Sequence, residues 1–424
     1  MGIKITRNPF ILFLPFLILY ILIVISFPTH GTSGDEERYL YFAHNLINGY
    51  FSRPIPHIDL GNGPGYPIIL IPFVVFHLPL ISITLLNAIL YYLSIVILFR
   101  ALLELIPFRL ALIFSLFWAL YYNSYQNIPQ ILTEVFTSSL ICFLLYLVIK
   151  AFNLPSSNKQ KLYVVLSGFV IGYIALTKPI FGYVILFVLP VLFILWLTKR
   201  KSDSYKKSLI IMVIAFITTV PYLLYTYHLT NRLFYWTPVG GNNIYWMTSP
   251  YENEYGSWIS YPVDSINDFI PGSKIKIDSL HKMDFYKLPN YKGLRQDDIL
   301  KKIAVHNIVS HPTKFIENCI SNAGRILFNF PFSYKAQSSR TLLRLPLTGT
   351  ILVFLLFCII PTILNWKKVN YSIRFLLLIA FVYLGGSIFG SAETRMFTVI
   401  VPILLFWIAY IFERTIKVKL RFDE

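Results

Sequence analysis

Long apolar runs separated by short polar segments make up most of the chain. Residues 64–79 are apolar too, but four prolines interrupt them and leave stretches too short to span a bilayer as helix. We interpret 64–79 as a juxtamembrane or re-entrant segment. Ten other runs are long enough to cross roughly 30 Å of hydrocarbon: 9–27, 81–99, 109–126, 131–149, 162–177, 180–197, 208–227, 342–364, 371–390 and 396–413.

Composition agrees with this pattern. Of 424 residues, 56% are hydrophobic and only 13% are charged, which predicts an all-α polytopic membrane protein. The three cysteines are scattered, so they support neither a disulfide framework nor a metal cluster. The net charge of +17 comes from Lys and Arg in short segments between apolar runs, where membrane orientation explains it. We therefore expect membrane lipid, and no nucleic acid, as a partner.

The basic segments also predict the topology. With ten crossings, they all fall on one side of the membrane, which the positive-inside rule makes cytoplasmic. Both termini are then cytoplasmic. The segments expected to face outward are 28–65, 127–130, 178–179, 228–341 and 391–395.

Three regions follow from this topology. Residues 1–227 form a transmembrane bundle that includes a first outer loop at 28–80, and residues 342–424 form C-terminal spans and a cytoplasmic tail. Residues 228–341 are long enough for a small outer subdomain. Its part 298–328 has apolar residues at helical spacing, broken at His311-Pro312, and predicts amphipathic helix at the membrane interface or packed on the spans.

Three adjacent carboxylates follow the first span. Asp35, Glu36 and Glu37 precede apolar residues at helical spacing that stop at Asn48-Gly49, which predicts a short helix along the membrane with an acidic first turn. We interpret Gly61 to Pro67 as a tight turn that brings the backbone close to a ligand or to this helix. The acidic turn places carboxylates where a reaction at the bilayer surface has use for them.

A few cations face outward against the topology signal. They suit an anionic group near the outer headgroups, such as a phosphate or diphosphate, because guanidinium and ammonium groups donate charge-assisted hydrogen bonds to it. The alternative is contact with ordinary lipid phosphate. Outside the long loop these cations are Arg38, Arg53, Lys178, Arg344 and Arg395.

Three other polar residues lie in or beside the segments that are expected to face outward. Glu134 begins a span, where it helps to hold a metal or position a donor, or stabilises the helix N-terminus. Glu393 is expected to pair with Arg395. His57 lies in the first outer loop without a partner at metal-ligand spacing, so it is weak support for a metal.

In this order along the chain, the motifs resemble those of the GT-C glycosyltransferases in the group related to protein O-mannosyltransferases and the lipid A aminoarabinose transferase (glycosyltransferase family 39-like). Relatives similar to the aminoarabinose transferase have an acidic–basic pair before the Pro-rich segment, where this chain has Asn62-Gly63. The motifs that carry the resemblance are Asp35-Glu36-Glu37-Arg38-Tyr39, Gly63-Pro64-Gly65-Tyr66-Pro67, Leu176-Thr177-Lys178-Pro179 and Arg395-Met396-Phe397.

The resemblance implies a GT-C bundle of about ten transmembrane helices. It also implies transfer of a sugar, with inversion, from a polyprenyl-phosphate donor to a glycan, lipid or protein acceptor on the outer face. Asp35 is then the general base, and Glu36 orients it or supports a divalent cation if one binds. Arg38, Lys178 and Arg395 are expected to bind the donor phosphate, and the residues expected to contact substrate are Tyr39, His57, Tyr66 and Glu134.

Two other functions compete with this one. A lipid-linked glycan flippase or transporter is expected to carry ionisable residues near the bilayer midplane, whereas Glu134 and Arg344 lie at span ends. A polysaccharide polymerase or ligase outside the GT-C fold uses the same donors. The Ile-, Lys- and Asn-rich composition indicates a bacterial inner membrane.

Overall fold

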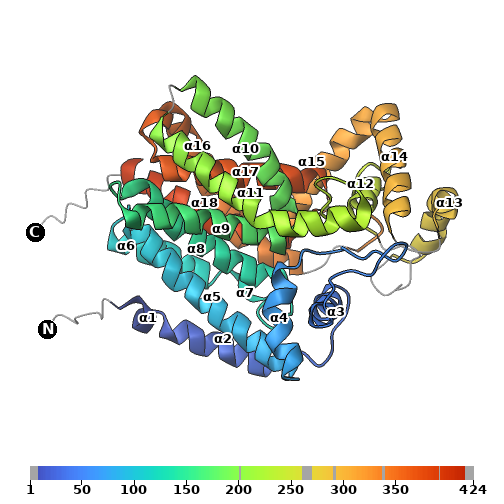
Figure 1. Ribbon diagram of the computed structural model, residues 1–424, viewed down its shortest axis with the longest axis horizontal. Coiled ribbons are helices and arrows are strands. Elements are labelled where there is room, and N and C mark those ends of the chain that lie inside the picture. The colour runs from blue at the N-terminus through green and yellow to red at the C-terminus, as the bar shows by residue number, and fades with distance from the viewer. Residues whose placement is uncertain are drawn as a thin grey trace, which may run out of the picture.

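The structure is a computed structural model that describes residues 8–199, 202–259, 270–289, 293–336, 340–390 and 392–415. Its regular elements are helices. The longest of them run side by side as a bundle, and a group of shorter helices lies at one end of it (Figure 1). The predicted all-α polytopic membrane fold is confirmed.

Eight of the described helices are long and apolar enough to cross a membrane, which makes the chain an integral membrane protein. They correspond to eight of the ten predicted spans. They are α5 (Leu80–Leu103), α8 (Thr133–Asn153), α9 (Asn158–Thr177), α10 (Ile180–Thr198), α11 (Asp203–Thr230), α16 (Arg340–Leu364), α17 (Tyr371–Phe389) and α18 (Thr394–Thr415).

The first predicted span, 9–27, is divided. It consists of α1 (Pro9–Leu12) and α2 (Leu14–Ser26), which meet at a single non-helical residue. Pro15 causes the break, because it has no N–H to donate to the carbonyl of Ile11. The two pieces together still cover nearly the whole predicted range.

The third predicted span, 109–126, is divided as well. It consists of α6 (Phe108–Ala119) and the short α7 (Tyr122–Tyr125). The backbone is extended at Tyr121, whose hydroxyl accepts a hydrogen bond from Asn123 at 3.2 Å. This buried side-chain bond stabilises a turn that the apolar pattern did not indicate.

The last helix is the centre of the bundle. Within the membrane-crossing stretch of α18, 83% of the residues are buried, against 22% for α16. A helix that is apolar on all sides is expected in such a buried position. The N-terminal end of α18 carries Arg395, so this residue is held by the most enclosed of the membrane-crossing helices.

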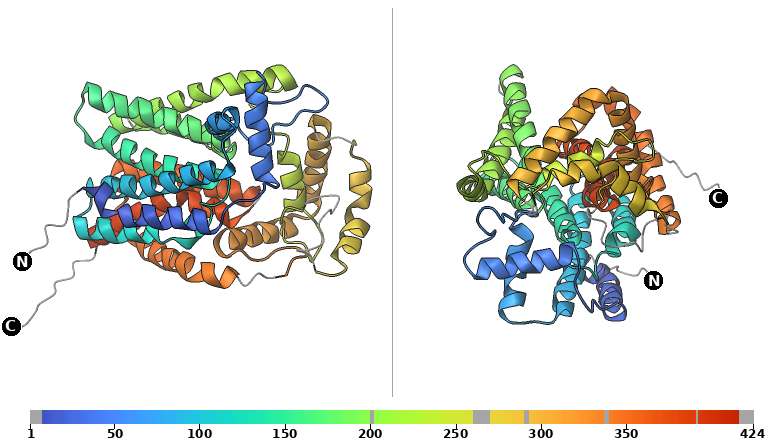
Figure 2. Two further views of the ribbon diagram at one scale, coloured as in Figure 1. Left: turned by 90° about the horizontal axis from the view of Figure 1, so that it is seen from below. Right: turned by 90° about the vertical axis from the view of Figure 1, so that its right-hand side faces the viewer.

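Two short helices lie across the end of the bundle. Both α3 (Asp35–Ile47) and α4 (Gly65–Val75) run roughly perpendicular to the long helices (Figure 2). The predicted helix from 35 to 47, with its stop at Asn48-Gly49, is confirmed. Eleven residues are too few to span the bilayer, so α4 agrees with the juxtamembrane interpretation of 64–79.

The other short helices beyond the bundle come from the loop predicted as a subdomain. The sequence placed a break at His311-Pro312, and the structure ends one helix and begins the next there. A small separate core is formed by Tyr245, Trp246 and Ile277 with their neighbours. The four helices are α12 (Gly240–Met247), α13 (Ser273–Tyr286), α14 (Leu294–Ser310) and α15 (Pro312–Phe328).

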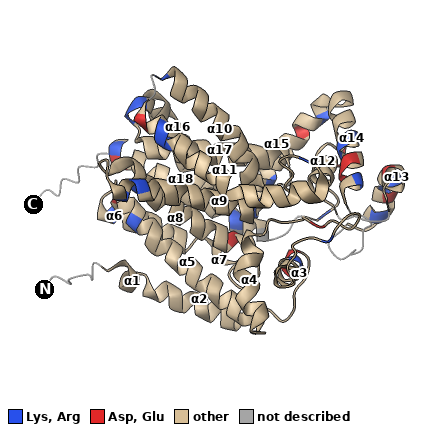
Figure 3. Cartoon of the chain, in the orientation of Figure 1, with Lys and Arg blue, Asp and Glu red and all other residues tan. Residues whose placement is uncertain are grey.

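The charges differ between the two ends of the bundle. Lys and Arg at the end where α1 begins and α18 ends have few Asp or Glu among them, whereas the subdomain and α3, at the other end, carry charges of both signs (Figure 3). A short helical turn at Trp366–Lys368 between α16 and α17 adds two lysines to the basic end. By the positive-inside rule, we expect the basic end in the cytoplasm and α3 outside.

This orientation is testable by cysteine labelling. In a variant with all native cysteines replaced, Glu252→Cys in the subdomain should react with a membrane-impermeant maleimide in intact cells. Ser156→Cys, in the loop between α8 and α9, should react only after permeabilisation. Both positions are exposed, so accessibility in the folded protein does not limit either reaction. Labelling of position 156 in intact cells would reverse the orientation.

Candidate active site

The site begins at the first turn of α3. Gly34 precedes the helix with φ of 59°, a conformation that favours glycine. Asp35, Glu36 and Glu37 then fill the first turn, where negative side chains interact favourably with the exposed N–H groups and the helix dipole. The local sequence therefore places three carboxylates at the end of the bundle opposite the basic end.

Asp35 is bound by two arginines. Arg38, one turn further along α3, donates to one carboxylate oxygen. Arg395, at the start of α18, donates to the other at 2.9 Å. The side chain of Asp35 is still one-quarter exposed, so the carboxylate remains accessible. Arg395 was expected to pair with Glu393, but its ion pairs in the structure are with Asp35 and Glu134.

Glu134 is bound by Lys178. The Lys178 ammonium, in the turn between α9 and α10, lies 2.8 Å from a Glu134 oxygen, and the Glu134 side chain is only 3% exposed. The Arg395 guanidinium lies 3.9 Å from the same oxygen. Five charges thus alternate in a chain, and three cations against two carboxylates leave one net positive charge. We call this set the ion chain: Arg38, Asp35, Arg395, Glu134 and Lys178.

A close backbone contact positions Lys178. A Cβ atom on Gly63 would lie 1.9 Å from the carbonyl oxygen of Leu176, which no side chain permits. Tyr173 donates from its hydroxyl to the carbonyl of Gly65 at 2.8 Å. The segment before α4 is therefore packed directly on the turn that carries Lys178. The sequence indicated a close backbone approach here, but to a ligand or to α3.

Glu36 has a different contact from its neighbour. One of its carboxylate oxygens accepts the backbone N–H of Ile131 at 2.9 Å. This bond joins α3 to the segment that leads into α8, which begins at Thr133. Glu36 therefore holds the acidic turn next to the start of the helix that carries Glu134.

The other residues expected to contact substrate lie apart from the ion chain or beneath it. Tyr39 and Tyr66 are buried and their rings make an edge contact, with centroids 5.1 Å apart. Burial, followed by the charges of Glu134 and Asp35, raises the pKa of the Tyr39 phenol, so it stays protonated. His57 is exposed on the connection between α3 and α4.

The charge state of Asp35 follows from its surroundings. Burial raises the pKa of the carboxyl, but the positive charges of Arg395 and Arg38 and their hydrogen bonds outweigh burial and hold the pKa below its usual value of 3.8. Asp35 is therefore ionised at neutral pH. It is able to accept a proton, and its protonation does not limit a reaction at that pH.

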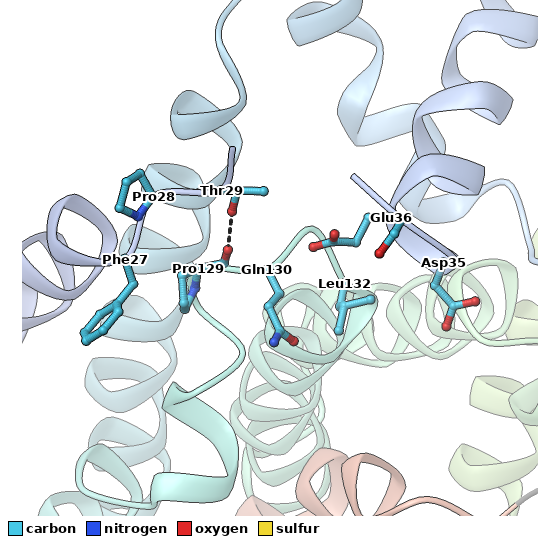
Figure 4. Close-up of a pocket in the computed structure, with 9 residues that line it drawn as sticks. Phe27, Pro28, Thr29, Asp35, Glu36, Pro129, Gln130 and Leu132 are labelled. Carbon is cyan, nitrogen blue, oxygen red and sulfur yellow. Dashed lines mark hydrogen bonds between the residues drawn. The ribbon is translucent and has the colours of Figure 1, made fainter. Parts of the chain in front are cut away.

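A cavity of about 510 Å³ that is largely open to its surroundings lies beside the acidic turn (Figure 4). Sequence reasoning found two of its lining residues and missed the others, because single polar or apolar side chains in short loops have no pattern that predicts a cavity. The segment 127–130 was expected only to face outward. The lining residues are Phe27, Pro28, Thr29, Ser33, Asp35, Glu36, Pro129, Gln130 and Leu132.

The carboxylates as arranged do not fit a divalent-cation site. Asp35 and Glu134 are each engaged by an arginine or lysine, and Glu36 accepts a backbone N–H. A divalent cation prefers several oxygen ligands without neighbouring cations. Among the described residues, no group of three or more His, Cys, Asp or Glu side chains is arranged to hold a metal.

No protein-family model matches the chain, and no curated protein matches it in sequence. Solved structures match it in fold. One is the oligosaccharyltransferase AglB from Archaeoglobus fulgidus in complex with an inhibitory peptide and a dolichol-phosphate, with 13% identity, coverage of 97% of this chain and 53% of that chain, and a TM-score of 0.52.

Two further structures are similar. The A. fulgidus oligosaccharyltransferase tethered with an acceptor peptide has 14% identity, coverage of 94% of this chain and 49% of that chain, and a TM-score of 0.52. ArnT from Cupriavidus metallidurans bound to undecaprenyl phosphate has 12% identity, coverage of 95% and 77%, and a TM-score of 0.42.

The likeness to the oligosaccharyltransferase shows the fold. The chain has the GT-C membrane fold that the sequence motifs predicted. It spans about half the length of the oligosaccharyltransferase chains that it matches.

The ion chain predicts a stability effect. Lys178→Met leaves the buried Glu134 carboxylate with only the more distant Arg395, and removing one partner of a buried ion pair costs about 3 kcal/mol. We expect a lower melting temperature for this variant in thermal unfolding of the purified protein. Adding Glu134→Gln should recover much of the loss, because the buried charge is then gone. Equal melting temperatures for Lys178→Met and the unmodified protein would show that the pair does not stabilise the fold.

Proposed function

We propose that the protein is a membrane glycosyltransferase that moves a sugar from a polyprenyl-phosphate donor to a hydroxyl-bearing acceptor at the outer face. The observation that carries the proposal is the ion chain. Four separate elements bring two carboxylates and three cations together at one end of a GT-C bundle, beside a cavity. The dolichol-phosphate in the AglB structure, which has the same fold, supports the donor class.

The acid–base step uses Asp35. The acceptor oxygen forms a bond to the anomeric carbon of the sugar while its proton passes to a carboxylate oxygen of Asp35. The bond between the anomeric carbon and the phosphate oxygen breaks, and its electron pair leaves with the polyprenyl phosphate. Attack from the side opposite the phosphate inverts the anomeric configuration.

The cations stabilise the leaving phosphate. When Asp35 takes the proton it becomes neutral. Arg38 then loses its counter-charge, and Arg395 keeps only the more distant Glu134, at the moment when the phosphate gains negative charge. The ion chain then has three cations and one carboxylate, or two net positive charges, against one before the reaction. Positioned cations at reduced dielectric are effective at such developing charge.

Glu134 and Lys178 have supporting roles in this scheme. The buried Glu134 carboxylate lies between Lys178 and Arg395 and fixes the position of both cations. Lys178 is 15% exposed, so its ammonium still reaches the donor phosphate. Glu36 orients the acidic turn through its bond to Ile131.

The positions of the ion pairs argue against the transport alternative. The ion chain joins residues at the outer ends of the spans and in α3, and the Glu104–Lys150 pair lies at the opposite end of the bundle. A coupled transporter needs ionisable groups near the bilayer midplane. A chemical step at the outer rim accounts better for charges held at this level.

Replacing Asp35 tests the proposal. With purified protein, a panel of polyprenyl-phosphate sugars and a panel of hydroxyl-bearing glycan, lipid and peptide acceptors, Asp35→Asn should lower kcat for release of carrier phosphate by about 10²–10⁴-fold, because a positioned general base contributes that much. Glu37→Gln is the matched control, since Glu37 is in the same turn but exposed. Equal rates for Asp35→Asn and the unmodified protein would remove Asp35 from the mechanism.

Arg38 tests the phosphate contact. Arg38→Gln should raise KM for the donor about tenfold, the effect of losing one charge-assisted hydrogen bond of about 1.4 kcal/mol. Asp35 keeps its second arginine in this variant, so the base stays ionised. Arg53→Gln is the control, because Arg53 lies over the Tyr41 ring on the exposed connection after α3. A donor KM that rises equally in both variants would indicate a general charge effect.

A further inference from the structure

Three segments of the chain line the cavity beside the acidic turn. The connection after α2 contributes Phe27 to Ser33, and the loop between α7 and α8 contributes Pro129 to Leu132. A hydrogen bond from the Thr29 hydroxyl to the Pro129 carbonyl joins these two walls (Figure 4). The first turn of α3 borders the cavity with Asp35 and Glu36, so the proposed base lies at its edge.

The charge in this cavity has one sign. Its nine described lining residues include two carboxylates and no lysine or arginine. The three cations of the ion chain bind Asp35 and Glu134 but do not line the cavity. Asp35 is already neutralised by Arg38 and Arg395, but a phosphate in the cavity would face the Glu36 carboxylate and find no lysine or arginine among the lining residues, which disfavours it. The cavity therefore suits a group without negative charge.

Polar groups in the cavity are suited to hydroxyls. Ser33 and Gln130 are exposed and offer donors and acceptors, and Glu36 has a second carboxylate oxygen besides the one bound to Ile131. A volume of about 510 Å³ is within the range of small-molecule sites. These features match a sugar or a similar polyhydroxyl group.

An apolar surface leads to the cavity from the membrane. Leu22, Ile25 and Phe27 are 54%, 57% and 68% exposed along the outer half of α2 and just beyond it. In a membrane-spanning segment such side chains face lipid. Phe27 belongs to this surface and also lines the cavity, so the two are continuous. A ligand with an apolar tail in the bilayer has a direct route for its headgroup.

We propose that this cavity is the acceptor site and that the acceptor is a membrane lipid with a hydroxyl-bearing headgroup free of negative charge. The inference rests on the proposed function, which it extends by naming the acceptor class. Asp35 then lies between two substrates: the acceptor hydroxyl enters from the cavity, and the donor phosphate lies on the side of Arg395 and Lys178. A soluble glycan, a peptide or a phosphorylated lipid is not expected there.

A binding measurement tests this without requiring turnover. Ser33→Cys, in a background with the native cysteines replaced, is labelled with an environment-sensitive fluorophore in lipid nanodiscs. The probes are a decyl glycoside of a neutral hexose, the same glycoside carrying a phosphate, and the free hexose. A label at Ser156→Cys, in the loop between α8 and α9, is the control for effects of the probes on the nanodisc.

The neutral decyl glycoside should change the fluorescence at position 33 at a concentration at least about tenfold below that of the other two probes. Gln130→Trp should weaken this binding about tenfold by filling the cavity, while the donor KM stays within about twofold. Equal binding of the phosphorylated glycoside or of the free hexose would overturn the proposal. The proposal would also be overturned if no probe changed the fluorescence at position 33, or if Gln130→Trp raised the donor KM.

The same experiment separates this inference from the proposed function. If the neutral decyl glycoside binds but no polyprenyl-phosphate sugar releases carrier phosphate, the cavity is a glycolipid site and the transferase proposal fails. If carrier phosphate is released but the glycoside does not bind, the transferase proposal stands and the acceptor class is wrong.

Discussion

The buried pair between Glu134 and Lys178 is the interaction on which the site depends. A carboxylate that is 3% exposed at the end of an apolar helix is unstable without a positive partner. Lys178 supplies that charge from another helix pair, and Arg395 supplies part of a second one from α18. Arg395 also binds Asp35. The contacts among Lys178, Glu134 and Arg395 therefore help to fix the acidic turn of α3 relative to the bundle.

The bundle and the short helices across its end contribute different features to the site. The long helices are held by apolar packing, with α18 most enclosed, and they give their ends fixed positions. The helices that lie across those ends carry the accessible side chains, among them Asp35 and Glu36. Reactive groups on short elements supported by a rigid scaffold are common in enzymes. Here the scaffold also fixes the position of the ion chain at the ends of the long helices.

Much of the fold was predictable because helices in a membrane need long apolar runs. Eight spans, the helix at 35–47 and the break at His311-Pro312 all follow from local sequence. The division of the span 109–126 did not follow. The turn at Tyr121 is stabilised by a hydrogen bond that Asn123 donates to the Tyr121 hydroxyl, and α6 and α7 are too short to stand out from one apolar run. The charges at span ends that the sequence singled out, Glu134, Lys178 and Arg395, lie together in the ion chain, and their role stays a prediction.

The partners of those charges were not predictable in the same way. Arg395 was assigned to Glu393, two residues away, but it binds Asp35, which is 360 residues away in sequence. Only tertiary packing brings them together. The cavity was not predicted for a related reason. Its walls at 27–33 and 129–132 are ordinary loop sequences, and they form a cavity only because the fold brings them next to each other.

The contact between Gly63 and Leu176 affects how mutational data on this protein should be interpreted. Even one added methyl group at position 63 displaces the backbone that carries Lys178, although Gly63 itself touches no ion pair. A saturation scan scored only by product formation would rank this glycine beside the aspartate and the arginines. The loss of product in Gly63 variants would then come from the displaced backbone at Leu176 and the misplaced Lys178. It would be a mistake to infer that position 63 takes part in the reaction.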